Sequence, residues 1–72
     1  MESEHLYNVA KRYVAVIEKM ERTHDAAKLP KLEEERAYWH DKLLQLFRRE
    51  GISYRDREHV TRLAYKIIRE FE

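Results

Sequence analysis

The chain has 72 residues, with 15 basic and 14 acidic side chains and a formal net charge of +1. A charge this close to zero gives no general affinity for nucleic acid, so an electrostatic function has to come from a local arrangement of charges. The absence of cysteine excludes disulfide bonds and thiolate zinc sites. No apolar stretch approaches the ~20 residues of a membrane span, and residues 1–5 are mostly polar. We expect a cytoplasmic protein with one domain, residues 1–72.

Apolar residues recur at alternating intervals of three and four in the first third of the chain. The series is Leu6, Val9, Tyr13, Val16 and Met20. This spacing places them on one face of a helix, and Ser3 is a common type of N-cap residue. We predict a first helix over about residues 3–27. Val14 on its flank widens the apolar face, as expected for a helix that contacts two neighbours.

Pro30 begins the second predicted helix, because proline suits the first turn, where its missing N–H is not needed. Apolar residues continue the same alternation at Leu32, Trp39, Leu43 and Leu46. Gly51 can take the left-handed conformation that ends a helix, so this helix covers residues 30–50. Arg36 interrupts its apolar face. We expect the Arg36 guanidinium to reach water; the alternative is a buried ion pair that fixes the helix register.

Ser53, followed three residues later by Asp56, resembles a capping box with Asp in place of Glu. It predicts a third helix over residues 54–71, with an apolar side formed by Val60, Leu63, Ala64, Ile67, Ile68 and Phe71. Three helices with short connections predict an all-α fold, a small antiparallel three-helix bundle. A chain of this size gains stability when a second copy covers apolar surface, so a homodimer stays open.

A line of basic residues follows the opposite side of the third predicted helix. It comprises Arg55, His59, Arg62, Lys66 and Arg69. Their spacings of four and three keep them on one helix face, and residues 42–69 hold eight basic and three acidic side chains, a formal +5. The alternative interpretation is a solvated face, in which Glu58 pairs with Arg62 and Lys66 with Glu70.

Tyrosines accompany this basic line. Tyr54 and Tyr65 lie on its flank, and Tyr38 points away from the apolar face of the second helix. Tyrosine is enriched among residues that dominate interface energies. We therefore predict a non-enzymatic protein-interaction module, of regulator or inhibitor type, that binds another protein or a second copy of itself through the basic line and these three tyrosines.

Two other functions stay open. The first is a nucleic-acid-binding regulator that contacts phosphates through Arg48, Arg49, Arg55, Arg62, Lys66 and Arg69. Residues 46–53 share a turn glycine with the helix-turn-helix motif, but Phe47, Glu50 and Arg57 depart from its residue pattern. The second is a structural or oligomerisation bundle without an external ligand.

Catalytic and metal-binding patterns are weak in this sequence. It has no cysteine nucleophile, no justified Ser-His-carboxylate grouping and no glycine-rich phosphate loop. Glu21 and His24 form one copy of a spacing that di-iron bundles use twice. We therefore expect no enzymatic activity, no metal or cofactor, no small-molecule substrate and no membrane partner.

Overall fold

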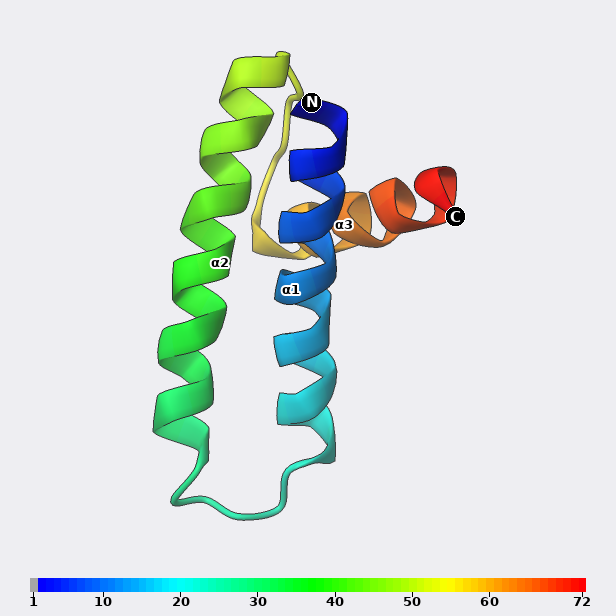
Figure 1. Cartoon of the computed structure of the whole chain (residues 1–72). Coiled ribbons are helices and arrows are strands. Elements are labelled where there is room, and N and C mark those ends of the chain that lie inside the picture. The colour runs from blue at the N-terminus through cyan, green and yellow to red at the C-terminus, as the bar shows by residue number, and fades with distance from the viewer. Residues whose placement is uncertain (1) are drawn as a thin grey trace.

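The computed structural model describes residues 2–72, with side chains described from His5 onwards. It contains three helices, α1 (Glu2–Arg22), α2 (Leu29–Glu50) and α3 (Arg57–Phe71). α1 and α2 run antiparallel, and α3 closes the bundle from the far side of α1 (Figure 1). The predicted all-α three-helix bundle is confirmed. No helix in this part of the chain combines the length and the apolarity needed to cross a membrane.

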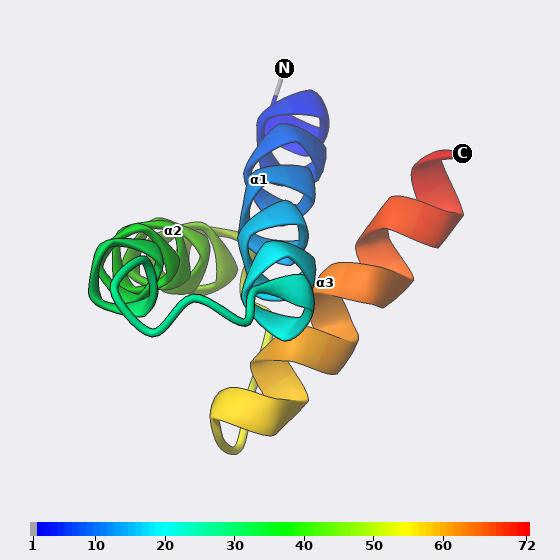
Figure 2. The same ribbon diagram turned by 90° about the horizontal axis from the view of Figure 1, so that it is seen from below.

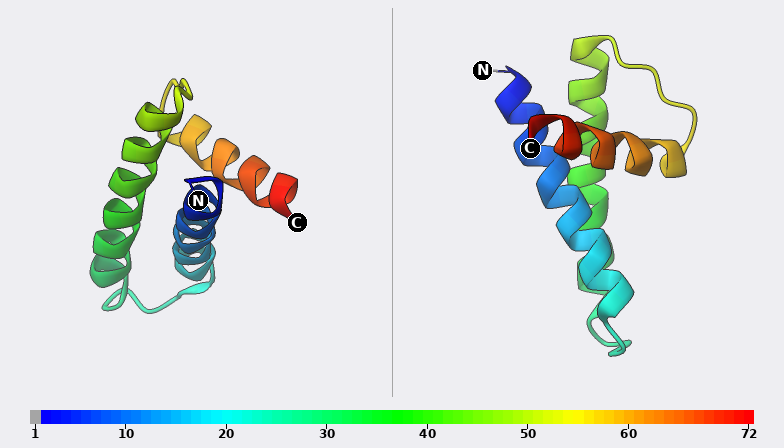
Figure 3. Two further views of the ribbon diagram at one scale, coloured as in Figure 1. Left: turned by 45° about the horizontal axis from the view of Figure 1, so that its top comes forward. Right: turned by 90° about the vertical axis from the view of Figure 1, so that its right-hand side faces the viewer.

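α3 differs from a simple up-down-up arrangement, because it crosses α1 at a steep angle (Figures 2 and 3). The non-helical connection 51–56 carries the chain from the end of α2 back to the middle of α1 (Figure 1). α3 packs chiefly on α1 and has little direct contact with α2. The helices of a helix-turn-helix pack on each other across a three- or four-residue turn, so α2 and α3 do not form that motif.

One apolar cluster holds the three helices together, and α1 lies at its centre. Its buried members are Leu6, Val9, Ala10, Tyr13 and Val14 from α1, Leu43, Leu46 and Phe47 from α2, and Val60, Ala64 and Ile67 from α3. Burial of apolar area from water is the main stabilising contribution in such a domain. The wide apolar face predicted for the first helix is confirmed, because α1 packs against both neighbours.

α1 ends at Arg22 and not near residue 27 as predicted. The Thr23 hydroxyl donates a hydrogen bond to the Lys19 carbonyl oxygen at 2.7 Å, and the Ala27 N–H donates to Asp25 Oδ1 at 3.0 Å. Short polar side chains of this type offer the backbone partners that compete with a continuing helix. Ser3, predicted as an N-cap, lies within α1, and its side chain is outside the described part.

The end of α2 is as predicted. Gly51 has φ 71° and ψ 25°, and the Ile52 N–H donates to the Phe47 carbonyl oxygen at 2.8 Å. This is the Schellman arrangement, in which the residue after the left-handed position folds back over the last turn. At the other end, α2 begins at Leu29, with Pro30 in its first turn.

The start of α3 corrects the predicted cap. Asp56, not Ser53, is the N-cap, because its Oδ1 accepts a hydrogen bond from the His59 N–H at 2.8 Å. The His59 side chain folds back, and its Nδ1 accepts from the Arg55 N–H at 3.0 Å. α3 therefore begins at Arg57, so Tyr54 and Arg55 belong to the connection and not to the helix.

Candidate interaction surface

The predicted basic line is a surface feature of the folded protein. We call Arg55, His59, Arg62, Lys66 and Arg69 the basic face. Its four arginine and lysine side chains are exposed, and His59 is half-buried. Val60, Ala64 and Ile67 on the other side of α3 are buried in the core, so the basic face points away from the bundle. Although Arg55 precedes α3, its hydrogen bond to His59 holds it at this face.

Ion pairing within the basic face is incomplete. Arg62 Nη2 lies 2.7 Å from Glu58 Oε1, and both side chains are exposed. This is one of the two pairs that a solvated face predicts; the second, between Lys66 and Glu70, is not formed. Within residues 5–72, Arg55, Lys66 and Arg69 have no ion-pair partner. An exposed pair contributes only about 0–1 kcal/mol, so Arg62 can exchange Glu58 for an external carboxylate at little cost.

A shallow hollow marks one end of the basic face, where α3 begins. It has a volume of about 170 Å³ and is lined by Arg55, Asp56, Glu58, His59 and Arg62. Two of these residues are acidic, and Asp56 Oδ1 already accepts a hydrogen bond from the His59 backbone. The hollow therefore extends the surface of the basic face but does not enclose a ligand.

The three predicted tyrosines lie in different environments. Tyr65 is 37% exposed, and partial burial, with the charges of Glu18 and Glu21 on α1, raises the pKa of its phenol. Tyr54 is half-buried against the core, with its ring centroid 6.0 Å from that of Phe47. Tyr54 therefore contributes to packing and is not a free stacking surface.

Tyr38 is separate from the basic face. It is 53% exposed on α2, and α2 lies on the other side of α1 from α3 (Figure 2). Its ring meets that of Trp39 edge-on at a centroid distance of 5.0 Å, and Lys42 Nζ lies 5.5 Å from its centroid. The fold thus brings only Tyr65 of the three tyrosines close to α3's exposed surface.

The six basic residues of the nucleic-acid alternative lie on three segments. Arg48 and Arg49 are exposed in the last turn of α2, Arg55 is exposed in the connection, and Arg62, Lys66 and Arg69 lie on α3. The connection 51–56 and the steep crossing of α3 separate the end of α2 from α3 (Figure 3). The six residues therefore do not lie on the two packed helices of a helix-turn-helix.

Arg36 and His40 form a polar junction inside the bundle, and the sequence did not predict this arrangement. Arg36 is only 8% exposed, and its Nε and Nη2 donate to Glu33 Oε1 at 2.9 and 2.6 Å. The expectation that its guanidinium reaches water is wrong, because the Arg36 side chain is buried. The ion pair of the alternative forms, but it lies within α2 and the Glu33 side chain is 46% exposed, so the pair is only partly buried and does not set the register between helices. The hydrogen bond and the charge of Arg36 lower the pKa of Glu33, while Glu33 raises the pKa of Arg36.

His40 lies one turn after Arg36 at the same junction. Burial lowers the pKa of His40, the charges of Arg36 and Arg57 lower it further, and Asp41 opposes the shift. His40 Nε2 and Arg36 Nη1 are both buried without a hydrogen-bond partner. Arg36 inside an apolar face was the signal for this junction. Its ion-pair partner Glu33 is local to α2, whereas its position beside Tyr13 and Arg57 depends on how the three helices pack.

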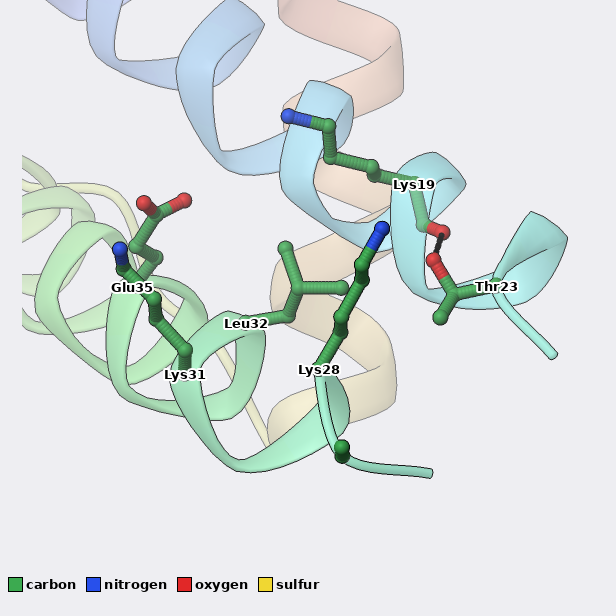
Figure 4. Close-up of a pocket in the computed structure, with 7 residues that line it drawn as sticks. Lys19, Thr23, Lys28, Lys31, Leu32 and Glu35 are labelled. Atoms are coloured by element: carbon green, nitrogen blue, oxygen red, sulfur yellow. Dashed lines mark hydrogen bonds between the residues drawn. The ribbon is translucent and has the colours of Figure 1, made fainter. Parts of the chain in front are cut away.

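A second basic cluster lies where α1 and α2 are joined. Lys19, Lys28 and Lys31 border an open hollow of about 480 Å³, together with Thr23, Ala27, Leu32 and Glu35. In Figure 4 the three ammonium groups are spread around Leu32 and do not converge on a common point, and Glu35 shares the rim. The hollow therefore lacks the convergent donors of an anion site.

Metal-binding geometry is not found either. Within the described side chains, no group of three or more His, Asp or Glu residues is placed to hold a metal ion. His24, half of the predicted di-iron-type pair, is exposed in the loop after α1.

Comparison with known proteins adds no family to this geometry. No protein-family model matches the chain. Neither a curated protein nor a solved structure matches it.

Proposed function

We propose that this protein is a small, non-enzymatic interaction module that binds an acidic segment of another protein on the basic face. The observation that carries the proposal is the lack of counter-ions for Arg55, Lys66 and Arg69. Their charges are exposed on one side of α3, and the opposite side of this helix is fixed in the core. A rigid helix that presents uncompensated cations favours a complementary acidic surface and sets the register of binding.

Two physical observations favour a protein partner over a nucleic acid. The net charge of +1 gives little long-range attraction to a polyanion. Arg48 and Arg49 belong to the last turn of α2, whereas most of the basic face is on α3, which packs chiefly on α1.

The test compares two double variants that carry the same net charge. Lys66→Glu/Arg69→Glu reverses the charge of the basic face, and Lys19→Glu/Lys31→Glu does the same at the α1–α2 loop. Each immobilised variant is used to capture partners from an extract of the native host, and the captured protein is then titrated in pure form. We expect the basic-face variant to lose at least about 10-fold in affinity, mainly through slower association. The loop variant should bind like the unmodified chain.

Equal binding by the two variants would refute the proposal. A cross-link between Lys66 and an acidic segment of the captured protein would support it directly. Circular dichroism of both variants has to show unchanged helicity, which is expected because the four substituted side chains are exposed.

Nucleic-acid binding is separated from this proposal by its dependence on salt. A chain that uses about four phosphate contacts on duplex DNA should show a slope of roughly −3 to −4 in log K against log salt concentration. We expect no such binding of DNA or RNA at low ionic strength. Binding with this slope that is lost on Arg48→Glu/Arg49→Glu would favour the nucleic-acid alternative instead.

A further inference from the structure

The apolar stripe of α3 is longer than the surface that α1 covers. Along the stripe, Val60 is 1% exposed, Ile67 8% and Phe71 49%. Figure 2 shows the reason: the C-terminal end of α3 diverges from α1 and lies far from α2. The stripe therefore begins inside the core and emerges at the surface in the last turn of α3.

The emerging stripe borders a groove between the two crossing helices. The α1–α3 groove is lined by Lys11, Val14, Ala15, Glu18, Tyr65 and Ile68, with a volume of about 280 Å³. Beyond it, the ring centroids of Tyr7 and Phe71 are 5.8 Å apart. Tyr65 and Phe71 are two of the three large exposed hydrophobic side chains among the described residues. Tyr65 lines the groove while it is partly exposed, so its ring is available to a molecule that covers the groove.

The charges at the rim of the groove are self-complementary, which means that the rim of one copy can pair with the rim of a second copy. Lys11 and Glu18 lie seven residues apart on one side of α1, about 10 Å along the helix, and each lacks an ion-pair partner within residues 5–72. The midpoint between them falls at Val14 and Ala15. A two-fold axis through this midpoint would place Lys11 of each copy opposite Glu18 of the other. A two-fold contact requires such self-complementarity.

We propose that a second copy of this chain packs on the α1–α3 groove about a two-fold axis close to Ala15. Ala15 is exposed, and its small side chain lets two α1 helices approach closely. Tyr65, Ile68 and Phe71 of both copies would be covered by this contact. The basic face stays outside, because it lies on the side of α3 that is opposite the core. The dimer would thus present two basic faces, which goes beyond the function proposed above.

Sedimentation at a series of protein concentrations tests this contact. The unmodified chain should change from its monomer mass of 8.9 kDa to twice that mass as the concentration rises. Ala15→Arg places a bulky charged side chain from each copy at the centre of the contact and does not touch the core. It should raise the dimer Kd by about 100-fold or more. Tyr38→Ser, at an exposed tyrosine on α2, is the matched control and should leave the Kd unchanged.

A charge exchange tests the predicted pairing of Lys11 with Glu18. Lys11→Glu alone and Glu18→Lys alone should each weaken the dimer, because like charges then face each other twice. An equimolar mixture of the two variants should form the heterodimer in preference to either homodimer, as measured by native mass spectrometry.

Three results would overturn the inference. They are a monomeric unmodified chain at every concentration up to the millimolar range, a dimer that persists in helical Ala15→Arg protein, and a variant mixture without preference for the heterodimer. Because the basic face is outside the contact, each of these results leaves the proposed partner binding intact, and failure of that binding leaves the dimer intact.

Discussion

The phenolic oxygen of Tyr13 lies 2.9 Å from Oγ1 of Thr61, and this contact joins α1 to α3 across 48 positions of the sequence. The Thr61 hydroxyl also donates to the Arg57 carbonyl oxygen at 3.2 Å. Since a threonine hydroxyl has a single proton, Tyr13 is the donor to Thr61 in this arrangement. The bond places a fully buried ring and the second turn of α3 in fixed positions relative to each other.

Tyr13→Phe should therefore lower the free energy of unfolding by about 1 kcal/mol, the usual net contribution of one intramolecular hydrogen bond. Urea unfolding followed by circular dichroism measures this change. A double-mutant cycle with Thr61→Val should give a clear coupling energy. Tyr38→Phe removes an exposed hydroxyl and should leave stability unchanged. Additive effects of the Tyr13 and Thr61 changes would show that the contact contributes nothing.

Glu33→Gln should destabilise the fold by roughly 1–3 kcal/mol, because it leaves the buried Arg36 guanidinium without its carboxylate. Arg36→Met combined with Glu33→Gln should regain most of this loss, since no buried charge is then left without a partner. The exposed pair of Glu58 and Arg62 gives the control. There, Glu58→Gln should change stability by less than about 1 kcal/mol, as measured by chemical unfolding.

Asp56→Ala should lower the free energy of unfolding by about 0.5–2 kcal/mol, because the His59 N–H loses its acceptor at the start of α3. Ser53→Ala should have little effect, since Ser53 lies three residues before this cap. Thermal unfolding of both variants checks the assignment. A larger effect of Ser53→Ala than of Asp56→Ala would restore the cap that the sequence predicted.

Stability should decrease as the pH falls through the ordinary His40 pKa of 6.5. Burial and the charge of Arg36 hold the pKa of His40 in the folded state below this value. The unfolded chain therefore takes up the proton at higher pH, so stability is fully present above 6.5 and declines below it until the folded-state pKa is passed.

Urea midpoints between pH 8 and pH 5 measure this decline. His40→Gln should flatten it, because the titrating group is removed, whereas His24→Gln, at the exposed loop after α1, should retain it. A profile that is the same in the unmodified chain and the His40→Gln variant would rule out His40 as its source.

Local pattern was sufficient to predict much of the fold. The three-four alternation predicted three helices, Pro30 and Gly51 marked the ends of α2, and the wide face of α1 indicated two neighbours. These features depend on residues within a few positions of each other, which a sequence shows directly. The helix ends at Arg22 and Arg57 were harder, because Thr23, Asp25 and Asp56 form hydrogen bonds that compete with or cap a helix, and several nearby residues could have done so.

The candidate surface also has features that could be predicted from the sequence and features that could not. The basic face could be predicted, because its residues share one helix face by spacing alone, and the buried side of α3 confirms that this face points outward. The positions of Tyr54 and Tyr38 could not be predicted, because one depends on the contact of the connection with Phe47 and the other on which side of α1 the second helix occupies.

The sequence by itself determined which residues are helical and which side of each helix is apolar, since both follow from backbone hydrogen bonding and side-chain spacing over short range. Only the tertiary structure decided that α3 crosses α1, that Arg36 is buried, and that the stripe ending at Phe71 is left uncovered. These features depend on how three helices of unequal length fill a common core, and this packing joins residues that are far apart in the chain.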